Sequence, residues 1–159
     1  MIDKRQFYIS GSWVDPKDGR DHQVINPSTE EACATISLGG QADTDAAVAA
    51  AKAALPAWMA TPVEDRIALV EKLLDLYNTR AADMAEAISM EMGAPIDMAA
   101  GQQTPAGSWH LKNFIRAAKE FEFDRPLNDR APNDRIIYEA VGVAALITPW
   151  NWPMNQVTL

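Results

Sequence analysis

Residues 141–153 read VGVAALITPWNWP, and this stretch decides the fold class of the chain. Its first part, Val141 to Ile147, is apolar without interruption and carries no charge. Strands of a parallel sheet that helices cover on both faces have this composition, because neither face meets water. The run therefore predicts a strand of a buried parallel sheet. Such a strand needs neighbouring strands, so we expect this chain to be part of a longer protein.

The turn that follows, Thr148 to Pro153, is the candidate site. Open α/β sheets bind their ligands at the carboxyl ends of their strands, which is where this turn would lie. Pro149 and Pro153 restrict its backbone. Asn151 places an amide donor between two tryptophans, and such a donor can stabilise an oxyanion. A turn of this kind also commonly buries an aromatic ring and uses the Asn as a local cap, so the residues alone leave both roles open.

Upstream, residues 7–40 have the pattern of short strands. The alternation from Phe7 to Val14 predicts a hairpin in which Gly11 adopts a positive φ. Val24 and Ile25 predict a second strand, which leads into a turn at residues 26–30. Ala32–Leu38 predicts a third strand, ended by two glycines.

From Asp43 the pattern becomes helical. Asp43 or Thr44 is the expected cap of a first helix, which Pro56 should break or kink near its end. A single long helix is predicted from about Pro62 to Met92, with Thr61 as the first residue of a capping box and Gly93 as the stop. Its apolar residues recur at spacings of three and four: Ile67, Val70, Leu74, Tyr77, Ala81, Met84 and Ile88.

Asp97 should cap a further helical stretch, interrupted by Gly101 and Pro105. Its later apolar residues fall roughly on one side: Trp109, Leu111, Ile115, Ala118 and Phe121. The segment from Asp124 to Arg135 is charged and rich in turn residues, which predicts a connector or the tip of a β-arm.

Composition excludes several classes of protein. Hydrophobic residues make up 48% and charged residues 23%, the range of soluble globular proteins. The net charge of -8 argues against a nucleic-acid or anionic-membrane partner, and no apolar run is long enough to span a bilayer. The single cysteine, Cys33, and the lack of a signal-peptide pattern favour the cytoplasm. Cys33 is interpreted as a small buried apolar residue, and His22 and His110 are too isolated to predict a metal site.

Taken together, the chain resembles the aldehyde dehydrogenase superfamily along nearly its whole length. Ala140 and Tyr138 depart from residues common in the family, Pro and Arg, without weakening the resemblance. The matching segments occur in the family's order: Tyr8–Val14, Val24–Glu31, Asp43–Ala54, Pro56–Trp58, Glu91–Pro95, Glu139–Val143 and Ile147–Pro153.

The resemblance implies the N-terminal part of an aldehyde dehydrogenase-like α/β fold, in which helices and short β-hairpins lead into the first strand of a Rossmann-like parallel sheet. Residues 1–124 would form the helical and hairpin part of the cofactor-binding domain. Residues 125–138 would form the β-arm through which members oligomerise, and residues 139–159 the first strand and turn of the sheet. A homo-oligomer is therefore expected of the complete protein.

The resemblance also implies roles for individual residues. Asn151 would bind the oxyanion, and Thr148, Pro149 and Trp150 would border the nicotinamide cofactor, NAD or NADP. Trp152 and Gln156 would line the aldehyde channel, with core packing as an equal alternative for Trp152. In some members a monovalent cation lies between the carbonyl matching Ile25 and the acid matching Glu91, and here this is a weaker expectation.

The implied reaction oxidises a small-molecule aldehyde to a carboxylic acid with NAD(P)⁺, through a cysteine thiohemiacetal. In the family the nucleophilic cysteine and the general-base glutamate follow the part matched here, so we expect the 159-residue chain alone to be inactive. An alternative is a non-catalytic module for interaction or oligomerisation. A closer rival is the reductive branch that acts on semialdehyde phosphates, although the Pro149–Pro153 turn favours the oxidising branch.

Overall fold

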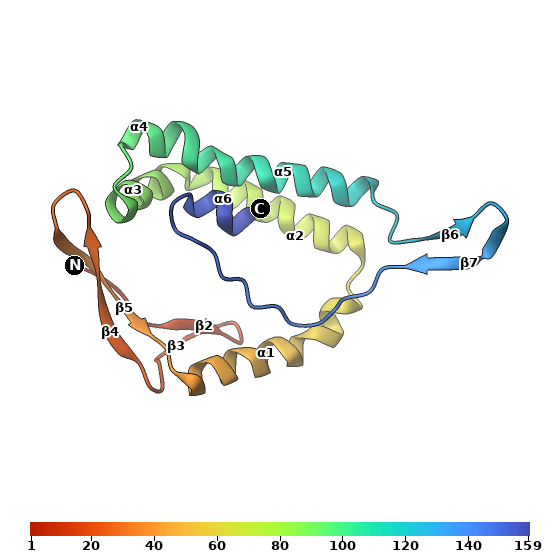
Figure 1. Ribbon diagram of the computed structural model, residues 1–159, viewed down its shortest axis with the longest axis horizontal. Helices are drawn as coiled ribbons and strands as arrows, with labels where there is room; N and C mark the ends of the chain where they lie inside the picture. The colour runs from red at the N-terminus through yellow and green to blue at the C-terminus, as the bar shows by residue number, and fades with distance from the viewer.

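The computed structural model describes residues 1–159 as helices with strands at one end and a projecting hairpin at the other (Figure 1). The strands are β1 (Ile2–Lys4), β2 (Phe7–Ile9), β3 (Ser12–Val14), β4 (Arg20–Asn26), β5 (Glu31–Leu38), β6 (Asp124–Asn128) and β7 (Ala131–Ile137). The helices are α1 (Gln41–Met59), α2 (Val63–Thr79), α3 (Ala81–Met92), α4 (Ile96–Met98), the π-helix η1 (Ala99–Gln103), α5 (Thr104–Glu120) and α6 (Pro153–Thr158). None of the helices combines the length and the hydropathy needed to cross a bilayer. The mixed α/β class is the predicted one.

The hairpin predicted at residues 7–14 is confirmed. Strands β2 and β3 pair antiparallel, with Phe7 opposite Val14. Ser10 and Gly11 have φ values of 53° and 78°, so both turn residues are left-handed, which matches the twist of a two-residue hairpin. Only Gly11 was expected to adopt this conformation.

The other two predicted strands, β4 and β5, form a three-stranded sheet in the order β1-β5-β4. β4 and β5 are antiparallel, and β1 lies parallel to β5 with Ile2 opposite Ala34. Strand β1 was not predicted, because its three residues include Asp3 and Lys4 and are too few to show alternation.

Helix α1 begins two residues before the expected cap. Its N-cap is Gly40, and Asp43 lies in the first turn, where its carboxylate accepts the Gly40 N–H at 3.0 Å. Pro56 lies within the helix, which continues to Met59. The residue four before it, Lys52, is exposed to solvent, so the carbonyl that Pro56 leaves without a helical donor is not confined to a core.

The expected long helix from Pro62 to Met92 is two helices in the structure, α2 and α3, which meet at Arg80 (φ −112°, ψ 17°). The Thr79 hydroxyl donates to the Leu76 carbonyl at 2.8 Å, and the Arg80 N–H bonds Tyr77 three residues back. These local bonds end α2, because they replace the regular helical pairing. The apolar stripe is nevertheless confirmed, since all seven of its residues are buried or half-buried.

Of the two predicted ends of this long helix, one is wrong and the other is confirmed. The N-cap is Pro62, without a side-chain bond, and the Thr61 hydroxyl donates to the Ala57 carbonyl of α1 instead, so the predicted capping box does not form. The stop at Gly93 is confirmed: its φ is 79°, and its N–H bonds the Ser89 carbonyl.

The interruption expected at Gly101 and Pro105 is wrong, because helix continues from Ile96 to Glu120 through η1. In a regular α-helix the ring of Pro105 would clash with the Gly101 carbonyl, and the wider π turn just before Pro105 relieves this conflict. The predicted face was also partly wrong, since Trp109 is 63% exposed and Phe121 is 47% exposed. The buried residues of this stretch are Ala99, Gln103, Thr104, Gly107, His110 and Leu111.

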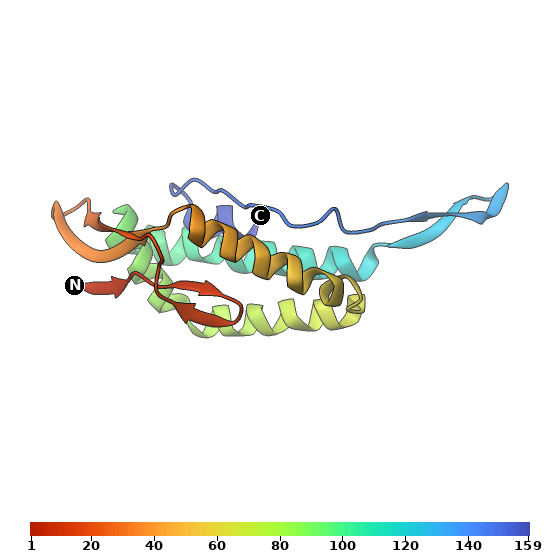
Figure 2. The same cartoon turned by 90° about the horizontal axis from the view of Figure 1, so that it is seen from below.

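The strand predicted at Val141–Ile147 does not form in this chain. Residues 138–149 have no regular structure, and Val141, Leu146 and Ile147 are fully or almost fully exposed. A lone strand cannot satisfy its own N–H and C=O groups, and no neighbouring strand lies beside this segment. The two expectations for residues 124–135 resolve toward the arm: β6 and β7 pair antiparallel and project beyond the helices in both views (Figure 1, Figure 2).

The core is small and lies where α3 meets the start of the continuous helix. Only 11 of the 159 residues are buried. Ala85, Ile88, Ala94 and Ala99 form the apolar cluster, and Met84, Met92 and Met154 pack against it. The last of these comes from α6, so the core reaches the segment that contains the candidate site.

Candidate functional site

The turn Thr148–Pro153 leads directly into α6, which lies against α5 (Figure 1). Pro153 is the first residue of α6, a position that proline favours because its missing N–H would have no helical partner. The Gln156 N–H bonds the Trp152 carbonyl at 3.0 Å and so closes the first helical turn.

Helix α6 packs against α5 and η1, and two of its side chains make contacts that can be named. Met154 packs against the apolar core cluster. Asn155 Oδ1 lies 2.9 Å from Nε2 of His110, a buried residue of α5. The turn that carries Asn151 therefore enters a helix whose contacts with the rest of the molecule include one apolar and one polar side-chain contact.

The structure bears on the alternative roles that the sequence left open for this turn. Trp150 is 74% exposed, so its ring does not fill a core. The N-cap of α6 is Trp152 and receives no side-chain bond, so Asn151 is not a local cap. Asn151 is exposed, whereas Trp152 and Gln156 are half-buried. The amide of Asn151 is accordingly free to donate to an external group.

A cavity of about 630 Å³ lies beside the turn. Trp150 and Pro153 line it together with Ile25 and Glu91, the two positions expected to flank a monovalent cation. The remaining lining residues come from β4, the Pro27 turn, β5 and α3: His22, Gln23, Val24, Pro27, Ile36, Met84, Ala87, Ile88 and Met92. Three of the site residues expected from the resemblance, Ile25, Glu91 and Trp150, therefore share one mainly apolar cavity.

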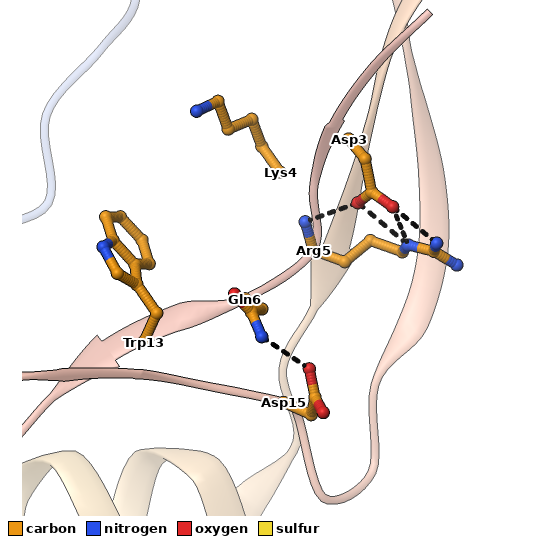
Figure 3. Close-up of a pocket in the computed structure, with 6 residues that line it drawn as sticks. All are labelled: Asp3, Lys4, Arg5, Gln6, Trp13 and Asp15. Carbon is orange, nitrogen blue, oxygen red and sulfur yellow. Dashed lines mark hydrogen bonds and ion pairs between the residues drawn. The ribbon is translucent and has the colours of Figure 1, made fainter.

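A second cavity, of about 390 Å³, lies near the N-terminus and contains none of the predicted site residues (Figure 3). Most of its polar side chains pair with one another: Arg5 pairs with Asp3 at 2.6 Å, and Gln6 donates to Asp15 at 2.9 Å. The hydrogen bonds from Arg5 lower the pKa of Asp3. Because Arg5 and Asp3 already pair and the cavity holds none of the predicted site residues, it is the weaker candidate for a site.

Cys33 lies in β5 and does not line the cavity beside Trp150. It is half-buried, and its thiol donates to the Val24 carbonyl at 3.3 Å within the sheet. These contacts are those of a residue that packs within the sheet, as the sequence suggested.

The contact between His110 and Asn155 was not anticipated from the sequence. The two residues are 45 positions apart, and neither belongs to a recognisable motif. The only local signal is that His110 lies one helical turn after Gly107, on the buried face of α5.

Comparisons with known proteins agree with this geometry. The model of the aldehyde dehydrogenase family matches residues 13–159. A 3-succinoylsemialdehyde-pyridine dehydrogenase from a Pseudomonas species is 40% identical over 99% of this chain. The crystal structure of an aldehyde dehydrogenase from Bartonella henselae superimposes with a TM-score of 0.97 and is 55% identical over 99% of the chain.

A variant of aldehyde dehydrogenase C from Pseudomonas syringae, crystallised with NAD⁺ and octanal, has a TM-score of 0.92 and 38% identity over 97% of the chain. The chain spans about a third of the length of these relatives: 32%, 33% and 31%, respectively. Both the sequence and the fold match over nearly all of the residues present, and the chain belongs to the aldehyde dehydrogenase family.

Proposed function

We propose that this chain is the N-terminal third of an enzyme that oxidises an aldehyde to a carboxylic acid with NAD or NADP. The observation that carries the proposal is the exposed Asn151 amide, in a turn that borders a mainly apolar cavity, within a chain of this family. A relative crystallised with NAD⁺ and octanal supports the classes of cofactor and substrate.

The proposed chemistry begins with a cysteine thiolate that Cys33 does not supply. Its sulfur bonds to the aldehyde carbon, and the carbonyl electron pair moves to oxygen as an oxyanion. Asn151 donates its amide N–H to that oxygen. A bound NAD(P)⁺ would supply the hydride acceptor, and loss of hydride from the former aldehyde carbon would leave a thioester for water to hydrolyse to the acid.

The residues of the turn fit a nicotinamide cofactor. The exposed ring of Trp150 offers a flat apolar surface at the cavity, and the exposed residues Thr148 and Pro149 leave backbone groups accessible beside it. We assign Trp152 and Gln156 to the aldehyde channel. A monovalent cation between the Ile25 carbonyl and the Glu91 carboxylate is a weaker proposal, supported by their place on one cavity.

The projecting arm of β6 and β7 favours a homo-oligomer of the complete protein. Leu127 and Ile137 on this arm are 45% and 62% exposed, and an apolar surface of this kind is suited to contact with another copy. The same exposed surfaces support the second candidate function, a non-catalytic interaction module. We expect the 159-residue chain by itself to form no NADH from an aldehyde and NAD⁺.

The role of Asn151 is tested by Asn151→Ala in the full-length protein that contains this chain. We expect kcat to fall about a hundredfold or more, because the loss of one oxyanion donor has this effect in other enzymes. Steady-state NADH formation measures it. Asn133→Ala removes an amide of the same size from an exposed position in β7, outside the turn, and should leave kcat unchanged. Unchanged turnover in Asn151→Ala would remove the proposed role.

A further inference from the structure

Helix α6 is too short to hold itself in place. It has six residues, from Pro153 to Thr158, and isolated helices of that length are not stable in water. Its position therefore depends on what it contacts. Asn151 lies two residues before its first residue, and the fixed φ of Pro153 couples the turn to the direction of the helix.

The apolar contact of α6 holds the helix against the core but restricts its orientation only weakly. Met154 packs against the cluster of Ala85, Ile88, Ala94 and Ala99. Methionine is unbranched and flexible, and its packing tolerates small rotations of the backbone that carries it. With this contact alone, the turn that carries Asn151 could change its orientation by small rotations.

The polar contact between His110 and Asn155 restricts the orientation of α6 further. His110 Nε2 lies 2.9 Å from Asn155 Oδ1, and His110 is only 7% exposed. The imidazole ring packs edge-on against the ring of Trp109, with centroids 4.9 Å apart. The hydrogen bond thus joins α6 to a ring whose own orientation is restricted. Removing either partner would leave a polar group without its bond in a largely dry place.

We propose that His110 is a positioning residue for the Asn151 amide, acting through Asn155 and α6. This inference rests on the proposed function of Asn151. An oxyanion donor works only when it lies about 2.7–3.1 Å from the oxygen that becomes charged. A displacement of about 1 Å at a reacting centre can lower turnover about a hundredfold. A loose α6 would produce such a displacement without removing any catalytic group.

The test uses His110→Phe and Asn155→Leu in the full-length protein. Phenylalanine keeps an aromatic ring, one atom larger than imidazole, beside Trp109 and removes both nitrogens, and leucine keeps the branched shape of asparagine without its polar atoms. We expect kcat to fall roughly tenfold to a hundredfold. The KM for the cofactor should change less than about threefold, because neither variant removes a group that binds the cofactor. Asn155→Asp retains an oxygen acceptor for His110 and should restore kcat to near the wild-type value.

A control separates positioning from general loss of stability. Asp43→Asn weakens the start of α1, which is far from α6 in the fold, and should lower the melting temperature without changing kcat (Figure 1). A fall in kcat that tracks melting temperature across all variants, with no rescue by Asn155→Asp, would overturn the inference.

A second measurement does not depend on activity. Hydrogen–deuterium exchange should show faster exchange at residues 154–159 in His110→Phe and Asn155→Leu, and wild-type exchange in Asn155→Asp. Unchanged exchange in His110→Phe overturns the anchoring of α6, whatever the enzyme does. If the two variants exchange faster than wild type but the wild-type protein oxidises no aldehyde with NAD⁺ or NADP⁺, the anchor stands and the proposed function does not.

Discussion

At the scale of single residues, Asp43 joins two segments of the chain through its two carboxylate oxygens. Oδ1 accepts the Lys17 N–H at 2.8 Å, and Oδ2 accepts the Gly40 N–H at 3.0 Å. The side chain is buried to 6% exposure, and these backbone donors lower its pKa. The carboxylate therefore fixes the loop before β4 to the start of α1.

This arrangement predicts a pH-dependent contribution to stability. Because the folded-state pKa of Asp43 lies below the ordinary value of 3.8, its contribution is present above that value. It is lost as the pH falls through the lowered pKa of the folded state. Asn at this position cannot accept both N–H groups as a carboxylate does, so Asp43→Asn should unfold more easily at neutral pH.

Urea unfolding of both proteins from pH 7 to pH 2.5 measures this effect. The difference in free energy of unfolding between wild type and Asp43→Asn should shrink below about pH 4. A difference that stays constant over the whole range would show that the Asp43 charge is not responsible.

At the scale of elements, the end of α3 depends on one glycine. Gly93 has a φ of 79°, and a Cβ added there would lie 2.6 Å from Cγ of Pro27. The positive φ would strain any residue with an L side chain, and the added Cβ would overlap sterically with Pro27 in the turn after β4. Gly93 thus allows both the helix end and the close approach of Pro27, which lines the cavity beside Trp150.

Gly93→Ala should accordingly lower the free energy of unfolding by about 2 kcal/mol or more, since the left-handed conformation alone costs roughly 1–2 kcal/mol and the contact with Pro27 adds to it. Gly101→Ala is the matched control, because a Cβ there meets nothing within 4 Å and φ is not positive. In a helix interior that change should be neutral or stabilising by up to about 1 kcal/mol. Equal effects of the two substitutions in denaturant titrations would contradict this account.

Elements with local causes could be predicted from the sequence. The hairpin at Gly11, the stop at Gly93 and the apolar stripe from Ile67 to Ile88 follow from backbone conformation and periodicity, which act within a few residues. The break at Arg80 and the π turn before Pro105 could not be predicted, because they result from competing hydrogen bonds and from steric conflict inside otherwise regular helices.

The candidate site divides in the same way. The Thr148–Pro153 turn is a contiguous motif, so its residues could be named from the sequence. Its support by His110 and its place beside Glu91 depend on packing between segments far apart in the chain, for which no local pattern exists. The roles of Asn151 and its neighbours stay predictions that the experiments above test.

At the scale of the whole molecule, the segment from Val141 to Ile147 has an apolar sequence suited to burial, but no other part of the chain covers it. Val141, Leu146 and Ile147 are 108%, 86% and 94% exposed. The backbone of residues 138–149 is in no sheet, so its hydrogen-bonding groups and its apolar side chains are available together. Segments of this kind are prone to pair with other chains.

The 159-residue chain by itself should therefore self-associate, and the association should depend on this segment. Val141→Lys combined with Leu146→Lys breaks the apolar run with two charges and should shift the chain toward monomer in analytical ultracentrifugation. Ser28→Lys combined with Gln102→Lys adds the same charge at exposed polar positions, so it separates the loss of apolar surface from the change in net charge. If the unmodified chain is a monodisperse monomer that unfolds cooperatively, the segment does not need partner strands, and the independent interaction module becomes the better account of the chain. If both double variants reduce association equally, the change in net charge causes the reduction, and the loss of apolar surface at residues 141–147 does not.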